Sequence, residues 1–253
     1  MNPFLDLLLF LATLLYSYLE AFVKLFVPVK RKSVSGELVL ITGAGHGVGR
    51  ATAVEFARRQ SRLVLWDINK HGVEDTAAEC ERLGATVQAF VVDCSKREEI
   101  YSAAEKVKKE IGDVSILVNN AGVITTADLL STQDHQIERM FEVNILAHMW
   151  TTRAFLPAMM NNNHGHIVTV ASAAGHFVTS FMVAYWLGKI LEIEEVVEAL
   201  MEGILTNQKM VFVPSHLSIA LLSEMLFPER ALVVLKKLTN AKFDAVIGQR
   251  STQ

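Results

Sequence analysis

The stretch ELVLITGAGHGVGR, residues 37–50, decides the fold of this chain. Its apolar run, residues 38–41, predicts a strand that is covered on both faces of a parallel sheet. Four glycines follow at alternate positions: Gly43, Gly45, Gly47 and Gly49. The first two permit a tight turn, the third lets a pyrophosphate approach the backbone, and the fourth lets the next helix lie close to the strand. The stretch therefore predicts a strand, a glycine-rich turn and a helix.

The pattern Thr-Gly-x-x-x-Gly-x-Gly within this stretch predicts a phosphate-binding cradle at a helix N-terminus. Free backbone N–H groups and the helix dipole favour an anion at that position. His46 and Val48 lie between the glycines and belong to the predicted cradle. Glycine clusters also form plain turns, so the motif depends on its strand and helix context.

The next unit of the chain strengthens the prediction of a dinucleotide site. A second apolar strand, residues 61–65, leads to Asp67 in the sequence LVLWDINK. An acidic residue about twenty positions beyond the cradle accepts hydrogen bonds from an adenosine ribose and repels the extra phosphate of NADP. Asp67 therefore favours NAD, although an aspartate after a strand is also a common helix N-cap or turn residue.

Composition excludes several classes of function. The chain has 253 residues, 51% of them hydrophobic, and a formal net charge of −3, so it is long enough for one sizeable core. It has no basic surface interleaved with aromatic residues, which argues against nucleic-acid binding. Cys80 and Cys94 show neither metal nor disulfide spacing, which suits a reducing compartment. His164 and His166 have no third ligand candidate nearby, so we predict no metal site.

The N-terminus differs in kind from the rest of the chain. Residues 7–19 carry no charge, and as a helix they would span about 20 Å, short of the roughly 30 Å hydrocarbon core of a bilayer. The segment lacks a basic start and an Ala-x-Ala cleavage pattern, so we predict a retained anchor over residues 1–28. Lys30, Arg31 and Lys32 would keep the following domain on the cytosolic side. The alternative is a buried core helix.

Strands and amphipathic helices alternate regularly after the second strand. We expect helices over residues 72–83 and 96–111, and strands over residues 86–92, 115–118 and 166–170. This alternation predicts parallel strands joined by right-handed crossovers. The predicted fold class is therefore α/β, a doubly wound Rossmann sheet over residues 33–253.

Polar and small residues stand at the ends of the third and fourth strands. Asp93 either bonds the adenine edge of a dinucleotide or caps the following helix. The fourth strand ends in Asn119, Asn120, Ala121 and Gly122, where small and amide-bearing residues let the backbone approach a cofactor. We therefore count Asp93 and residues 120–122 among the candidate cofactor contacts.

Four further residues are candidates for catalysis. Asn144 lies inside a predicted helix, residues 133–160, where asparagine either faces solvent or marks a kink that turns a carbonyl toward the site. Ser172 follows the fifth strand, where open α/β sheets bind their ligands. Tyr185 and Lys189 would share one face of a helix, and a lysine beside a tyrosine lowers the tyrosine pKa toward neutrality. For that pair alone, two surface residues remain an alternative.

Together these motifs resemble the short-chain dehydrogenase/reductase family in order and spacing. The resemblance rests on TGAGHGVG, Asp67, NNAG, Asn144, Ser172 and Tyr185-x-x-x-Lys189. Longer stretches are similar to the lipid-droplet 17β-hydroxysteroid dehydrogenases of types 11 and 13: VLWDINKHG, FVVDCS, GDVSILVNNAG, FEVNIL, NHGHIVTVASAAGH, GILTNQKM and FPERALVVLKK. The resemblance covers nearly the whole chain.

The resemblance implies an NAD-dependent enzyme that oxidises a hydroxyl group on a steroid, a retinoid or another lipid. It also implies a homodimer on the endoplasmic reticulum and lipid droplets. By this comparison Ser172 holds the substrate oxygen and Tyr185 transfers the proton. Lys189 binds the nicotinamide ribose and tunes Tyr185, and Asn144 holds a relay water.

One departure from the family pattern falls near residues 186–192. Family members continue after Tyr-x-x-x-Lys through the rest of a long helix, a sixth strand and a substrate loop, whereas here Lys189 runs directly into ILEIEEVVEALMEGIL. We therefore expect a sheet that is one strand short. We also expect the helix after Lys189 to act as a right-handed crossover that places residues 209–213 as a strand beside the fifth strand.

The departure leaves two functions open. The first is a membrane-anchored NAD-dependent oxidoreductase. The second is a catalytically impaired protein of lipid droplets that binds NAD or acts as a dimerisation partner. The sequence also leaves open whether Lys189 is the family lysine or falls in register through the junction.

Overall fold

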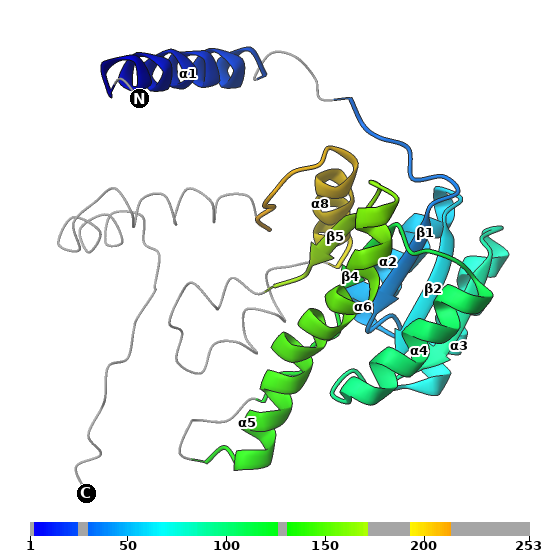
Figure 1. Ribbon diagram of the computed structural model, residues 1–253. Helices are drawn as coiled ribbons and strands as arrows, with labels where there is room; N and C mark the ends of the chain where they lie inside the picture. The colour runs from blue at the N-terminus through cyan, green and yellow to red at the C-terminus, as the bar shows by residue number, and fades with distance from the viewer. Residues whose placement is uncertain (1–2, 25–29, 126–130, 172–192, 214–253) are drawn as a thin grey trace, which may run out of the picture. The chain divides into compact units, whose positions relative to one another are not determined.

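The computed structural model describes residues 3–24, 30–125, 131–171 and 193–213 (Figure 1). The chain divides into two units, Met1–Ser33 and Val34–Gln253. The first unit contains helix α1 (Pro3–Lys24), and the second contains a five-stranded sheet with helices on both faces.

All pairings within the sheet are parallel. Its strands are β1 (Leu38–Thr42), β2 (Arg62–Asp67), β3 (Val87–Val91), β4 (Ile116–Asn119) and β5 (His166–Thr169). They lie in the order β3-β2-β1-β4-β5. The order reverses on either side of β1, and such a switch point opens a crevice at the carboxyl ends of the strands. The predicted doubly wound α/β fold is confirmed.

Helices form a layer on each face of the sheet. One face carries α2 (Gly47–Arg58), α3 (Lys70–Arg82) and α8 (Ile193–Leu205), and the other carries α4 (Arg97–Glu110) and α6 (Ala147–Asn161). The side chains of β1 alternate between two cores, because successive residues of a strand point to opposite faces. Val39 and Ile41 pack under α2, whereas Leu38 and Leu40 pack under α4 and α6. The apolar run that opens the glycine motif therefore lies at the centre of both cores.

The long helix predicted for residues 133–160 has the expected extent but is not continuous. It consists of α5 (Asp134–Phe141), a π-helical turn η1 (Glu142–Leu146) and α6. The N–H of Ala147 bonds the carbonyl of Glu142, five residues back, instead of the carbonyl four residues back. Asn144 lies at the middle of this turn, and π-turns of this kind occur frequently at functional sites.

The strand predicted for residues 209–213 is wrong, because these residues form no strand and pair with none of the five strands that the structure describes. Helix α8 packs against α2, on the face opposite to α6. A strand that followed α8 and lay beside β5 would need a left-handed crossover, which sheets almost never use. Val211 instead lies against α8, where a Cβ on Gly203 would be 2.4 Å from its Cγ2.

Helix α1 carries a dense set of exposed apolar side chains. Among its described side chains these include Phe4, Leu8, Leu11, Leu15 and Leu19. Within the described residues, no helix combines the length and the apolar character that a membrane span requires.

Candidate functional site

A cleft of about 340 Å³ opens at the carboxyl ends of the central strands. Nine residues that we predicted as cofactor contacts line it: Gly43, His46, Gly47, Val48, Asp67, Asp93, Asn120, Ala121 and Gly122. They come from four separate stretches of the chain, and the strand order β3-β2-β1-β4 brings them together. The other two glycines of the cradle, Gly45 and Gly49, lie behind its surface, where they allow close packing.

The glycines of the cradle differ in the space around the Cβ position and in the backbone φ angle. A Cβ on Gly49 would lie 2.0 Å from the carbonyl oxygen of Gly43, so any side chain there would displace the turn. Gly43 has a φ of +66°, and a Cβ on it would lie 2.8 Å from the Cα of Ala121. Gly47 has a φ of +55° and nothing within 4 Å of the Cβ position, so it leaves open space at the cleft. Gly49 therefore packs the helix against the turn itself, where we had expected contact with the strand.

The N-terminus of α2 is available to an anion. The N-cap residue, His46, makes no side-chain cap hydrogen bond, and the first turn of the helix contains no acidic residue. The first N–H groups of a helix have no intrahelical partners and carry a partial positive charge. No protein carboxylate of that turn competes with a phosphate at this helix end.

Asp67 is placed at the cleft by two backbone hydrogen bonds. Its Oδ2 accepts from the N–H of Gly45 at 2.8 Å, and its Oδ1 accepts from the N–H of Asn69 at 2.8 Å. Its side chain is only 4% exposed. The N-cap of α3 is Asn69, which accepts from the N–H of Gly72. The helix-cap alternative for Asp67 is therefore wrong, whereas the turn alternative describes its bond to Asn69.

Asp93 stabilises a turn at the far side of the cleft. Its Oδ1 accepts from the N–H of Ser95 at 3.0 Å and from the Ser95 hydroxyl at 2.7 Å. Burial acts to raise the pKa of Asp93, but the Ser95 hydrogen bonds and the charges of Arg139 and Lys96 outweigh it and hold this pKa below its usual range. The N-cap of α4 is Lys96, so Asp93 is not the cap of that helix.

The loop after β4 is held against the cradle by Thr42. The Thr42 hydroxyl accepts from the N–H groups of Asn120 and Ala121, both at 3.0 Å. The Asn120 side chain returns a bond to the Thr42 carbonyl at 2.9 Å and to the Gly43 carbonyl at 3.2 Å. These bonds fix residues 119–122 beside the glycine turn.

Asn144 clamps the next residue of the same loop. Its Oδ1 accepts from the N–H of Val123, and its Nδ2 donates to the carbonyl of Val123, both at 2.8 Å. A π-helical turn interrupts the helix at Asn144, in line with the alternative that expected a kink there. The group that makes the contact is the side-chain amide, which bonds the backbone of Val123. The π-turn brings the amide to the backbone edge of the loop.

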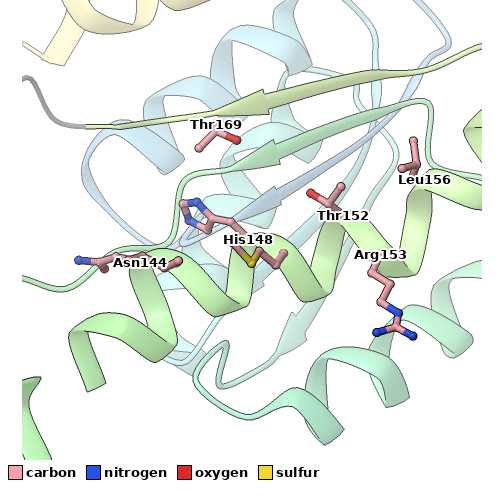
Figure 2. A pocket seen from close by; sticks show the side chains of 8 residues that line it. Asn144, His148, Thr152, Arg153, Leu156 and Thr169 are labelled. Carbon is pink, nitrogen blue, oxygen red and sulfur yellow. The ribbon is translucent and has the colours of Figure 1, made fainter. Parts of the chain in front are cut away.

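His148 lies one turn further along and holds the loop from a second point. Its Nε2 is 3.1 Å from the carbonyl oxygen of Ala121. Burial lowers the pKa of His148, and the hydrogen bond to Ala121 only partly offsets this, so the ring is neutral at neutral pH and donates through Nε2. Figure 2 shows His148 and Thr152 on the side of the helix that faces Thr169 of β5, whereas Arg153 points away. These residues line a groove of about 580 Å³ beside the loop.

Cys94 lines the cleft but is not a nucleophile. Burial raises the pKa of its thiol to about 12, and the charges of Asp93 and Asp67 act in the same direction. The thiolate is the reactive form of cysteine, so a thiol with this pKa is inert at neutral pH.

Comparisons with known proteins agree with this geometry. The sequence model for short chain dehydrogenases matches residues 37–191, more than half of the chain. The chain belongs to the short-chain dehydrogenase family. The family match ends at residue 191, next to the junction that we identified from the sequence.

Two relatives of this short-chain dehydrogenase align over nearly its whole length. Estradiol 17-beta-dehydrogenase 11 of Rattus norvegicus is 55% identical, and 17-beta-hydroxysteroid dehydrogenase 13 of Homo sapiens is 51% identical; each alignment covers 99% of both chains. Both alignments run over 296 positions, more than the 253 residues of this chain, so part of each relative has no counterpart here. This agrees with an internal deletion.

The fold of this short-chain dehydrogenase is also found in solved structures. An NAD⁺-bound xylitol dehydrogenase is 28% identical, with a TM-score of 0.57 over 62% of this chain and 61% of that one. As a member of this family, the chain is an oxidoreductase by class.

Three predicted catalytic residues, Ser172, Tyr185 and Lys189, lie outside the described residues. The described part of the site also contains residues that we did not predict, among them Thr42, Ile68, Arg139 and His148. Thr42 opens the glycine motif itself, and Ile68 follows Asp67, so both had a signal in the sequence. The positions of the Arg139 and His148 side chains in the site depend on the π-turn at Asn144. The periodicity of the sequence does not indicate such a turn.

Proposed function

We propose that this chain is an NAD-dependent oxidoreductase that oxidises a hydroxyl group on a steroid, a retinoid or another lipid. The observation that carries the cofactor assignment is the buried carboxylate of Asp67 at the edge of the cleft, with Gly45 and Asn69 holding it in place. The support for a lipid hydroxyl is the likeness to estradiol 17-beta-dehydrogenase 11 and 17-beta-hydroxysteroid dehydrogenase 13.

The residues of the cleft fit a nicotinamide dinucleotide. The uncapped N-terminus of α2 and the open position at Gly47 suit the pyrophosphate, and Asp67 suits the adenosine ribose. Asp93 and Ile68 line the same cleft and would contact the adenine. When bound, the dinucleotide supplies a hydride acceptor for the substrate carbon.

The protein would supply the proton chemistry and the positioning. Ser172 would hold the substrate oxygen, and Tyr185 would take the hydroxyl proton with Lys189 favouring its phenolate. Asn144 would position a relay water. Its two bonds to Val123 support this role, because they tie the π-turn to the loop that borders the cofactor cleft.

The proposed location is the surface of lipid droplets and the endoplasmic reticulum, with the catalytic domain in the cytosol. Support comes from α1, which exposes many apolar side chains. Its Thr and Ser hydroxyls bond the helix backbone: Thr13 donates to the carbonyl of Leu9 and Ser17 donates to the carbonyl of Thr13, both at 2.8 Å. Hydroxyls that are satisfied within a helix lower the cost of placing that helix in lipid.

We expect residues 1–28 to be sufficient to bring a fluorescent protein to lipid droplets. The matched control is the same fusion with Leu11→Asp and Leu15→Asp, because each charge in the apolar face costs up to about 3 kcal/mol in lipid. Fluorescence microscopy should show droplets outlined by the first fusion and a diffuse signal from the second. A diffuse cytosolic signal from the unchanged segment would contradict the anchor.

A second copy of the chain is the proposed partner of the domain. Exposed apolar side chains recur along one stretch of α5 to α6: Phe141, Ile145, Met149, Leu156 and Met160. Residues at spacings of three and four share a helix face. An apolar face of this length is typical of an association surface.

A second candidate function is a catalytically impaired protein that binds NAD on lipid droplets. The observation that favours it is the absence of a strand over residues 209–213, which leaves β5 without a second strand partner among the described residues. An NAD-linked assay separates the two functions. NADH formation by the full chain with estradiol or retinol supports an active oxidoreductase, whereas NAD binding without NADH formation supports the second candidate.

A further inference from the structure

Strand β5 forms one edge of the sheet. Strand β4 pairs with its inner side, and among the residues that the structure describes no strand lies on its outer side. The N–H groups of His166 and Val170 bond backbone carbonyls on the β4 side, at 2.8 and 2.9 Å. Neighbouring residues of a strand direct their backbone groups to opposite sides, so Ile167 and Thr169 present an N–H and a carbonyl each to the outer edge.

This edge adjoins the place where the chain is shorter than its relatives. The family match ends at residue 191, and the relatives align over 296 positions against the 253 residues of this chain. Residues 209–213 do not cover the edge, because Val211 lies against Gly203 of α8. An open strand edge is a template for pairing with another chain.

An apolar flank of η1 and α6 runs beside the same edge. Ile145, Met149 and Leu156 are exposed, and they line the groove of about 580 Å³ together with Thr169 of β5. Figure 2 shows Thr169 across from this helix, with Arg153 pointing away. An occupant of this surface therefore needs both a strand for the edge and apolar side chains for the flank.

We infer that two copies of this chain join through their β5 edges, as antiparallel strands with Val168 at the two-fold axis. The inference rests on the proposed partner, a second copy of the chain. Ile167 of each copy then exchanges two backbone hydrogen bonds with Thr169 of the other copy, four bonds in all. The strand contains no Asp, Glu, Lys or Arg, so no like charges oppose each other across the axis.

The helix flanks complete the interface, because four hydrogen bonds are too few for a stable dimer. A typical stable interface has about ten hydrogen bonds and buries about 1,600 Å². The two-fold axis of an antiparallel strand pair is perpendicular to the sheet, so α6 of both copies lies on the same face of the joined sheet. Met149 and Leu156 of the two copies then face each other across the axis. A second copy supplies both the strand and the apolar flank, whereas an extended peptide supplies only the strand.

Oxidative cross-linking of the purified full chain in detergent tests the register. Val168→Cys places two thiols at the axis, where the Cα atoms of such a pair are about 4.5 Å apart, within the range of a disulfide. Ile167→Cys is the matched control, because its two thiols are diagonal neighbours about 7–8 Å apart. Cys80 and Cys94 are buried, and the wild type measures any cross-linking through them. On a non-reducing gel, Val168→Cys should run mainly as a dimer, and the wild type and Ile167→Cys mainly as monomers.

A proline at the edge tests the backbone pairing. Thr169→Pro removes an N–H that faces outward, so the ladder with β4 keeps its bonds, and proline is tolerated at such edge positions. Thr169→Ala is the control that keeps the N–H. The proline removes one hydrogen bond per copy, so the dimer dissociation constant should rise on the order of tenfold or more in Thr169→Pro and change little in Thr169→Ala. Sedimentation equilibrium in density-matched detergent gives the constants, and thermal unfolding checks that both variants fold.

The outcomes separate the inference from the proposed function. If Val168→Cys cross-links no better than Ile167→Cys, or if Thr169→Pro dimerises as tightly as the wild type, the copies do not meet at β5 and the inference is wrong. A wild-type dimer in that case still supports a second copy as partner, through another surface. If the wild type is a monomer, the inference and the proposed partner fail together. Calorimetric titration with NAD tests the proposed function independently in each case.

Discussion

Replacing Gly49 with alanine is expected to abolish dinucleotide binding and to lower the free energy of unfolding by about 3 kcal/mol. The new Cβ would lie 2.0 Å from the carbonyl oxygen of Gly43 and 2.6 Å from the side-chain nitrogen of Asn120. The first of these atoms is backbone and cannot rotate away. Gly43 is itself held close to Ala121, so the turn has no free direction in which to move.

The matched control is Gly47→Ala, two residues earlier in the same cradle. Gly47 has nothing within 4 Å of its Cβ position, so alanine there meets only the strain of a positive φ, about 1–2 kcal/mol. We expect this variant to stay folded but to bind NAD weakly, because Gly47 lines the cleft. Urea unfolding followed by circular dichroism gives both stabilities. Equal stability losses in the two variants would mean that Gly49 is not packed as described.

Restoring the missing block after Lys189 is expected to raise the rate of NAD-dependent oxidation by about a hundredfold or more. Misplacement of reacting groups by about 1 Å costs on the order of a hundredfold, and water in an uncovered site weakens charge stabilisation further. The present chain forms the cradle and the side of the cleft that we propose for adenosine, but residues 209–213 do not extend the sheet beyond β5. Binding of the adenosine half should therefore survive better than hydride transfer.

Tyr185→Phe in both backgrounds is the control for this comparison. In the restored chain the substitution should remove nearly all activity, because the proton acceptor is lost. In the present chain it should cost little, because geometry already limits the rate. The measurement is NADH absorbance with estradiol and retinol as substrates. A rate in the present chain that equals that of the restored chain and is abolished by Tyr185→Phe would contradict the expected effect of the deletion.

The sheet could be predicted from the sequence because each strand ends in a residue with a local signal. Apolar runs before Gly43, Asp67 and Asn120 place three strands, and their alternation with helices makes them parallel strands joined by right-handed crossovers. The same rule failed for residues 209–213, because it requires knowing the face on which α8 packs. That face is decided by contacts with α2, which are distant in sequence.

The site was predictable where its residues belong to one motif and unpredictable where they depend on a turn of the backbone. The contact between Asn144 and Val123 exists because a π-turn interrupts the helix, and a regular helical pattern does not show such a turn. His148 reaches Ala121 for the same reason. The close approach of His46 to Asp67 joins two strand ends that are neighbours only in the sheet.

The most direct test of the central claim is calorimetric titration of the full chain with NAD and with NADP at about pH 8, alongside Asp67→Asn. The amide keeps the size of the carboxylate but removes the charge that would face a 2′-phosphate. We predict that the wild type binds NAD on the order of a hundredfold more tightly than NADP, because one unit charge acts at close range in a partly buried site. We also predict that Asp67→Asn removes most of this preference for NAD. Equal affinity of the wild type for NAD and NADP, or no binding of either, would contradict the assignment of this cleft.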